Sequence, residues 1–347
     1  MRRRSLAAGA ALALALALAG YGLASVSGRP DTARARPAPA TRPAPATRHR
    51  LAAPELPPRL HPPYAVGERV IRIVDDTRTV RYPGRPPEPR TLVTVVRYPA
   101  VGPPSRLDAR NAAPDRAAGP FPLIVFGHGF AVTPATYFRL LRAWARAGFV
   151  VAAPVFPLEN AHAPGGPDES DLVNQPRDMS VVISRMLAAD TNPRALLHGT
   201  MAPRQIAVAG QSDGGETALA VAYDRYYRDP RVRAAVILSG AQIPGADALT
   251  FPSGAPPLLA TQGTADTINL PRLSYAFFRA ASRPKFLLRL LGAPHLPPYT
   301  FEQPQLSIVE RTTIDFLNRY LKDDGDGVAR LRQAADRPGV AELTADP

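Results

Sequence analysis

The sequence predicts an α/β fold, a mostly parallel central sheet with helices on both faces and an antiparallel pair of strands at its N-terminal edge. Between residues 121 and 322, short apolar runs alternate with helical patterns, which is typical of parallel strands joined by helical crossovers. The runs are continuous rather than alternating, as expected for strands buried on both faces. Before them, segments 69–80 and 91–100 alternate apolar and polar residues. These two segments predict the antiparallel edge.

The length and composition indicate a chain that can form a folded domain, and the distribution of its charge does not indicate nucleic-acid binding. The chain has 347 residues, of which 45% are hydrophobic, and a net charge of +13. Much of that charge lies in residues 1–62, which hold ten Arg against Asp31 and Glu55. The rest is spread without a basic block, so we expect no nucleic-acid partner. There is no Cys, which excludes disulfides, a thiolate nucleophile and a Cys-ligated zinc. We predict neither a cofactor nor a metal.

The N-terminal residues predict export. Arg2, Arg3 and Arg4 precede an uncharged apolar run over 6–26, the pattern of a signal peptide. The run is also long enough to span a bilayer uncleaved. We therefore predict a signal peptide or signal anchor over 1–27 and a secreted or extracytoplasmic location, with membrane attachment left open. Residues 28–62 are rich in Pro, Ala and Arg and predict a disordered linker. The folded domain is predicted over 63–347.

The elements of that domain follow from periodicity. Continuous apolar runs predict buried strands at 122–127, 149–155, 206–209, 233–239, 257–262 and 285–291. Apolar residues at helical spacing predict helices at 133–147, 171–189, 270–281 and 305–322. In the second helix, Val173 and Val182 are among the expected inner positions. The acidic segment 323–327 lacks the spacing and closing Glu of a calcium loop, so we interpret it as a helix-ending turn.

The segment around Ser212 predicts a nucleophile elbow. Gly210-Gln211-Ser212-Asp213-Gly214 lies between an apolar strand and a helical pattern. In such an elbow, the serine occupies a strained backbone conformation, and the strand and helix pass too close for a Cβ at the glycines. The N-terminus of the following helix also favours negative charge near the serine.

A catalytic triad is predicted from the positions of three side chains after successive strands. Ser212, Asp266 and His295 each follow a predicted strand, and the carboxyl ends of parallel strands share one edge of a sheet. Serine is a weak nucleophile without a base. We therefore predict Ser212 as the nucleophile, His295 as the general base and Asp266 as the acid that orients the imidazole. Backbone N–H groups of Phe130 and Asp213 are predicted to form the oxyanion hole.

Each of these residues also has an ordinary structural interpretation. Ser212 could be a turn serine, and His295 a solvent-facing loop histidine. Asp266 could cap a helix that starts near Ile268, in which case Asp247 is the substitute acid.

Further polar residues are expected to have no catalytic role. We expect His128 to shape its loop rather than to react, and His162 and His198 to lie on the surface. Glu216 is interpreted as an acidic residue in the first turn of a helix, where the helix dipole favours it.

Four motifs resemble those of the α/β-hydrolase superfamily. They are the segments 128–130, 210–215 and 263–266, together with His295. Within the superfamily, the sequence resembles dienelactone-hydrolase-like and chlorophyllase- and polyester-hydrolase-like secreted serine esterases over about residues 65–335. The resemblance implies an α/β-hydrolase catalytic domain with Ser212, Asp266 and His295 as its triad and Phe130 and Asp213 as its oxyanion donors.

Two departures from the family pattern limit this comparison. Gln211 stands where His or Trp is common before the nucleophile, which affects the expected shape of the pocket. Dienelactone hydrolases of the cytosol use a Cys nucleophile, and this chain has no Cys. That particular activity is therefore not expected.

The sequence thus predicts an exported serine hydrolase that cleaves carboxylic esters through an acyl-enzyme intermediate. A small-molecule, lipid or polymer ester is the expected substrate, and the pocket walls are expected from 130–137, 158–171 and 242–251. Two alternatives stay open: an acyltransferase that uses the same triad, and a non-catalytic envelope binding protein on a hydrolase scaffold.

Overall fold

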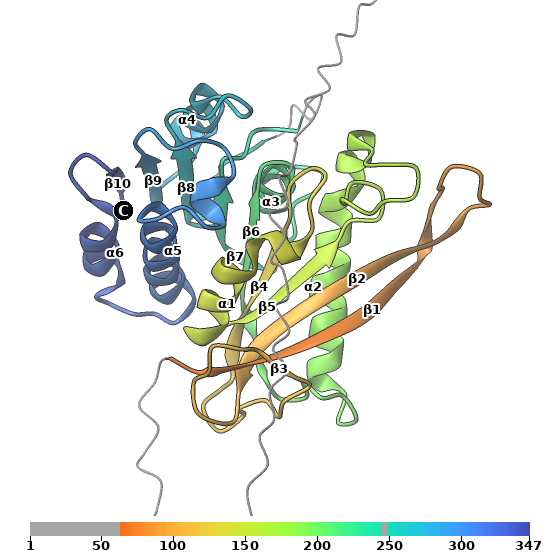
Figure 1. The fold of residues 1–347 in the computed structure, drawn as a ribbon. Coiled ribbons are helices and arrows are strands. Elements are labelled where there is room, and N and C mark those ends of the chain that lie inside the picture. The colour runs from red at the N-terminus through yellow and green to blue at the C-terminus, as the bar shows by residue number, and fades with distance from the viewer. Residues whose placement is uncertain (1–62, 244–248) are drawn as a thin grey trace, which may run out of the picture. The chain divides into compact units, whose positions relative to one another are not determined.

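A computed structural model describes residues 63–243 and 249–347 (Figure 1). Within these ranges the chain forms a ten-stranded sheet. Its strands, in chain order, are β1 (Ala65–Val80), β2 (Glu88–Ala100), β3 (Ala109–Arg110), β4 (Phe121–Gly127), β5 (Val150–Val155), β6 (Met201–Gln211), β7 (Val232–Leu238), β8 (Leu258–Gly263), β9 (Lys285–Leu290) and β10 (Ala341–Asp346).

The sheet is parallel in its centre and has antiparallel pairs toward both ends, apart from the short terminal strand β3, which pairs parallel with β1. Its spatial order is β10-β9-β8-β7-β6-β4-β5-β2-β1-β3. All pairings from β5 through β4 to β9 are parallel, whereas β2 pairs antiparallel with both β1 and β5. Every residue of β4 is buried, as a continuous apolar run requires in the middle of such a sheet. The predicted mostly parallel sheet with an antiparallel N-terminal edge is confirmed.

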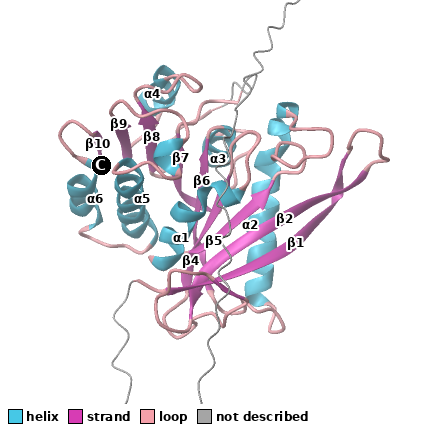
Figure 2. Ribbon diagram, viewed as in Figure 1, coloured by secondary structure: helices cyan, strands magenta, loops and turns pink. Residues whose placement is uncertain are grey.

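Helices cover both faces of the sheet (Figure 2). The helices are η1 (Pro134–Tyr137), α1 (Phe138–Arg146), η2 (Glu169–Asn174), α2 (Gln175–Thr191), α3 (Asp213–Tyr223), α4 (Pro271–Ala280), η3 (Pro297–Tyr299), α5 (Gln305–Leu321) and α6 (Gly327–Ala335). Apolar residues of α2, α3 and α4 pack in one core cluster, and those of α1, α5 and α6 pack in a second. Two core layers therefore enclose the sheet.

The second predicted helix begins later than its periodicity suggested. Residues 169–174 form the short helix η2, and the α-helix starts at Gln175 with Pro176 in its first turn, a position that suits the fixed φ of proline. Val173 is 47% exposed, so its prediction as an inner position was wrong. Val182 is fully buried, as expected.

The C-terminal end of the domain contains two elements that the periodicity did not predict. Segment 323–327 ends one helix and leads into α6, which agrees with its interpretation as a turn. After α6, β10 pairs antiparallel with β9, with Ala341 opposite Leu290. The strand is only partly buried, so its sequence lacks the clear apolar pattern of a central strand.

The predicted signal segment 1–27 and linker 28–62 lie outside the described residues. In the part of the chain that the structure does describe, no helix combines the length and the apolar character needed to cross a bilayer.

Candidate active site

The turn after β6 has the geometry of a nucleophile elbow. Ser212 lies between β6 and α3 with φ 57° and ψ −126°, a backbone conformation that is strained for a residue with a Cβ. A Cβ on Gly210 would lie 1.9 Å from the carbonyl oxygen of Gly214, and one on Gly214 would lie 2.1 Å from that of Gly127. Both positions therefore require glycine, as the sequence predicted.

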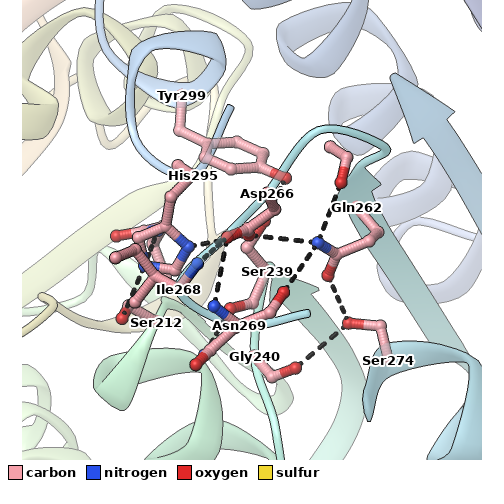
Figure 3. Close-up of polar contacts among 12 residues, drawn as sticks. Ser212, Ser239, Gly240, Gln262, Asp266, Ile268, Asn269, Ser274, His295 and Tyr299 are labelled. Carbon is pink, nitrogen blue, oxygen red and sulfur yellow. Dashed lines mark hydrogen bonds and ion pairs between the residues drawn. The ribbon is translucent and has the colours of Figure 1, made fainter. Parts of the chain in front are cut away.

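The structure brings the three predicted triad side chains into contact (Figure 3). The Nε2 atom of His295 lies 2.8 Å from Oγ of Ser212, and its Nδ1 lies 2.7 Å from Oδ2 of Asp266. Since a carboxylate only accepts hydrogen bonds, Nδ1 carries the proton and Nε2 accepts from the serine hydroxyl. The geometry is that of a nucleophile, a base and a group that orients the base.

Asp266 makes the contacts expected for both of the roles considered from the sequence. Its Oδ1 accepts from the backbone N–H groups of Ile268 and Asn269 at 2.9 and 3.1 Å, and its Oδ2 accepts from Gln262 at 3.0 Å as well as from His295. Burial raises the pKa of this carboxyl, but the hydrogen bond and charge of His295 and the other donors outweigh it and lower the pKa. The cap and the triad role are compatible. Asp247, the substitute acid, lies outside the described residues.

Side chains around Asp266 hold its loop in place (Figure 3). The Asn269 amide donates to the carbonyl oxygen of Ser239 at 2.8 Å. The Gln262 amide oxygen accepts from the Ser274 hydroxyl at 2.7 Å. Sequence reasoning missed these contacts because each depends on segments that only the folded sheet brings together.

Gln211, the departure from the family pattern, links two loops of the site. Its Oε1 accepts from the Tyr137 hydroxyl at 2.7 Å, and its Nε2 donates to the carbonyl oxygen of His295 at 3.1 Å. The Tyr137 hydroxyl in turn accepts from the N–H of Gly129 at 3.2 Å. Gln211 therefore connects the histidine loop to the loop after β4.

His128 is fully buried, and both of its ring nitrogens are engaged. Its Nε2 accepts from the N–H of Phe156 at 3.0 Å, which leaves Nδ1 to donate to the carbonyl oxygen of Gly129 at 2.8 Å. Burial lowers its pKa to about 4, so the ring is neutral at physiological pH. This agrees with the predicted structural role. His162 and His198 are exposed, as expected.

The segments that carry the two predicted oxyanion donors meet beside Ser212. Asp213 is the first residue of α3. Phe130 follows Gly129, where an added Cβ would lie 3.1 Å from the Cβ of Ser212. Both segments are therefore close to the serine hydroxyl, and the use of these two N–H groups as donors stays a prediction. The expected pocket wall 242–251 is only partly described, because 244–248 lie outside the described residues.

Two buried acidic residues near the nucleophile were not recognised as part of the site. Glu159 is fully buried, and burial and then Asp213 raise its pKa to about 11. Burial followed by Asp213 also raises the pKa of Glu216 to about 8, although a hydrogen bond from Asn269 opposes this. Glu159 lies in a polar loop whose sequence shows no periodicity, and the sequence indicates Glu216 only as a first-turn residue.

The mostly parallel sheet, with a sharp turn after β6 and polar loops after β8 and β9, has the architecture of the α/β-hydrolase fold, as the motifs of the sequence implied. Residues 99–247 match the family model described as Chlorophyllase. This segment runs from β2 through the elbow and ends before Asp266 and His295. No curated protein matches the chain. The fold and the family match together indicate an ester hydrolase of the α/β-hydrolase type.

Proposed function

We propose that the protein is a serine hydrolase that cleaves carboxylic esters through an acyl-enzyme intermediate. The observation that supports this most strongly is the pair of contacts that His295 makes, at 2.8 Å to Ser212 and 2.7 Å to Asp266. The family match over residues 99–247 supports ester hydrolysis as the class of reaction.

In the first half of the proposed reaction, Nε2 of His295 takes the proton of Ser212 while Oγ attacks the ester carbonyl carbon. Asp266 holds the imidazole through Nδ1–H and stabilises its charged form. The N–H groups of Phe130 and Asp213 stabilise the oxyanion of the tetrahedral intermediate. The intermediate collapses when His295 returns the proton to the leaving alcohol, and the acyl group stays on Ser212.

In the second half, water replaces the alcohol. His295 takes a proton from the water as its oxygen attacks the acyl carbon, and a second tetrahedral intermediate forms. Its collapse breaks the bond to Oγ, returns the proton to Ser212 and releases the carboxylic acid. Competition by added alcohols would reveal acyl transfer, the alternative outcome of this step.

The substitution Ser212→Ala tests the nucleophile. It should lower kcat for p-nitrophenyl esters by about 10⁴ to 10⁶ and abolish labelling by a fluorophosphonate. The exposed Ser184 provides a control, since Ser184→Ala should leave both turnover and labelling unchanged. Unchanged ester turnover in the Ser212 variant would exclude the proposed mechanism. A panel of p-nitrophenyl esters of graded length would then define the acyl preference.

We also propose that the protein is exported. The support is the run of Arg2, Arg3 and Arg4 before the uncharged apolar segment 6–26. Cell fractionation combined with N-terminal sequencing tests this, because a released protein should begin after the apolar segment and an anchored one should retain it in the membrane fraction. Full-length protein found only in the cytosol would overturn the proposal.

A further inference from the structure

A second carboxyl group lies directly beside the proposed nucleophile. Asp213 follows Ser212, is only 7% exposed, and places Oδ1 3.4 Å from the serine Oγ. Its Oδ2 is buried and has no hydrogen-bond partner among the described residues. A negative charge so close to Oγ opposes the negative charge that develops on the adjacent oxygen of a tetrahedral intermediate. The position and charge of this carboxyl therefore matter for the reaction.

The neighbour of Asp213 is another buried acid, Glu159. None of the Glu159 surface is exposed, and neither of its carboxyl oxygens has a donor in the described part of the chain. After burial, Asp213 is the main influence on the Glu159 carboxyl, both as a side-chain hydrogen-bond partner and as a negative charge. Two carboxylates can only accept hydrogen bonds, so they would repel in this site. If one of them keeps a proton, it donates to the other, and both buried groups gain a partner.

Burial and the neighbouring negative charges favour the proton on Glu159. Burial is the largest cause that raises its pKa to about 11, and the negative charges of Asp213, Asp171 and Glu169 act in the same direction. The loop after β4 carries His128, which is neutral. The Tyr137 hydroxyl on η1 also interacts with both acids, and burial raises its pKa far above neutrality. On α3, Glu216 interacts with Asp213, and its own pKa is raised by burial and then by the charge of Asp213. Glu159 is therefore protonated at neutral pH.

The backbone of Glu159 supports the other half of the proposed oxyanion hole. Its carbonyl oxygen accepts from the N–H of Ala131 at 2.9 Å, directly after Phe130. Ala131 has a φ of 54°, a left-handed conformation that needs such support. The Asn160 amide donates to the carbonyl oxygen of Phe156 at 2.7 Å and fixes the loop. Glu159 thus contacts both segments that carry the proposed oxyanion donors, one through its backbone and one through its side chain.

We propose that Glu159 is a positioning residue of the hydrolase. Its protonated carboxyl donates a hydrogen bond to the carboxylate of Asp213. This bond fixes the start of α3 and the position of the Asp213 charge beside Ser212. The inference rests on the proposed ester hydrolysis. Glu159 touches no reacting atom and acts through Asp213.

Two substitutions separate this role from a purely structural one. Glu159→Gln keeps a side-chain donor of the same size and should retain kcat within about threefold, since the hydrogen bond to Asp213 survives. Glu159→Ala removes the donor and should lower kcat by about 10- to 100-fold, part of the cost of losing an oxyanion donor, with KM nearly unchanged. Asp76→Ala is the control, because Asp76 is an exposed acid on β1 outside the expected pocket walls and should leave kcat unchanged. Thermal unfolding identifies any variant that does not fold.

Infrared spectroscopy tests the shared proton directly. The difference spectrum between the wild-type protein and Glu159→Gln at pH 7 should contain the carbonyl stretch of a protonated carboxylic acid. That band and kcat should both decline as the pH approaches about 11, while the Gln variant keeps its activity there. Absence of the band, or equal loss of kcat in the Gln and Ala variants, would overturn the proposal. A folded wild-type protein that shows the band but cleaves no ester would instead overturn the proposed function.

Discussion

Two groups of buried carboxyl side chains in the described residues differ in whether arginines neutralise them. Beneath the N-terminal edge of the sheet, Arg90 contacts Asp171 and Asp178, each at 2.6 Å, and all three are almost fully buried. Arg78 joins Asp178 to Asp75 at the margin of the same network. Beside Ser212, by contrast, Glu159 and Asp213 form no ion pair among the described residues. The first group ties β1 and β2 to the helices, whereas the second lies at the site.

Within the paired network, the arginines offset burial to different degrees. At the fully buried Asp178, burial outweighs the hydrogen bonds and charges of Arg90 and Arg78, and the pKa is raised. At Asp75, burial raises the pKa, but hydrogen bonds from Thr77 and Arg78 outweigh it and lower the pKa. At Glu159 no cation offsets burial, and the pKa rises. A carboxyl whose proton binding is shifted without a structural counter-ion marks a functional region more often than a scaffold. We therefore expect the paired network to stabilise the fold and the unpaired acids to act at the proposed active site.

The largest effect on stability is expected at the centre of the paired network. Arg90→Met leaves Asp171 and Asp178 buried without their main counter-ion and should lower the free energy of unfolding by about 3 to 5 kcal/mol. Urea denaturation measures the loss. Arg85→Ala is the matched control, because Arg85 makes only an exposed pair with Glu88 at 3.9 Å and should change stability by less than about 0.5 kcal/mol. If the free energy of unfolding fell by the same small amount in the Arg90 and Arg85 variants, the buried network would not support the fold.

A smaller change in stability, of opposite sign, is expected at Glu216, a buried acid near Ser212 that has a hydrogen bond from Asn269 but no counter-ion among the described residues. The pKa of Glu216 is raised from 4.5 to about 8. A raised pKa means that its protonated form stabilises the fold fully below pH 4.5, and that this contribution is lost as the pH rises to about 8. Glu216→Gln should therefore leave stability unchanged near pH 4.5 and raise it by about 1 kcal/mol or more at pH 8, since one pKa unit corresponds to about 1.4 kcal/mol. Urea titrations at the two pH values measure this. A gain of the same size at both would refute the burial of an ionisable Glu216.

The sequence predicted those features that depend on local sterics or on topology. The elbow could be predicted because Gly210 is required by its contact with Gly214 in the same turn. Gly214 is itself required by Gly127 of β4, a contact that only the folded sheet makes, but the spacing of the motif already marks its position. The convergence of Ser212, Asp266 and His295 followed from their positions after parallel strands, which meet at one edge of the sheet.

The missed features depend on packing between distant segments. Glu159 is polar and lies in a loop without periodicity, and only the fold buries it against Asp213. The sequence could not show that Asp266 makes the contacts of both a cap and a triad acid. Only the structure shows that Oδ1 accepts from the N–H of Ile268 while Oδ2 faces the imidazole of His295. The last strand, β10, is half-exposed at the edge of the sheet and therefore carries a weak pattern.

The rate at which a fluorophosphonate labels Ser212 tests the central claim most directly, because labelling needs the hydroxyl to be activated by His295. The substitution His295→Gln should lower the second-order rate constant of labelling by about 10² to 10⁴. His198→Gln, which changes an exposed histidine outside the site, should leave the rate constant unchanged. Labelling of Ser212 at the wild-type rate in the His295 variant would contradict the account.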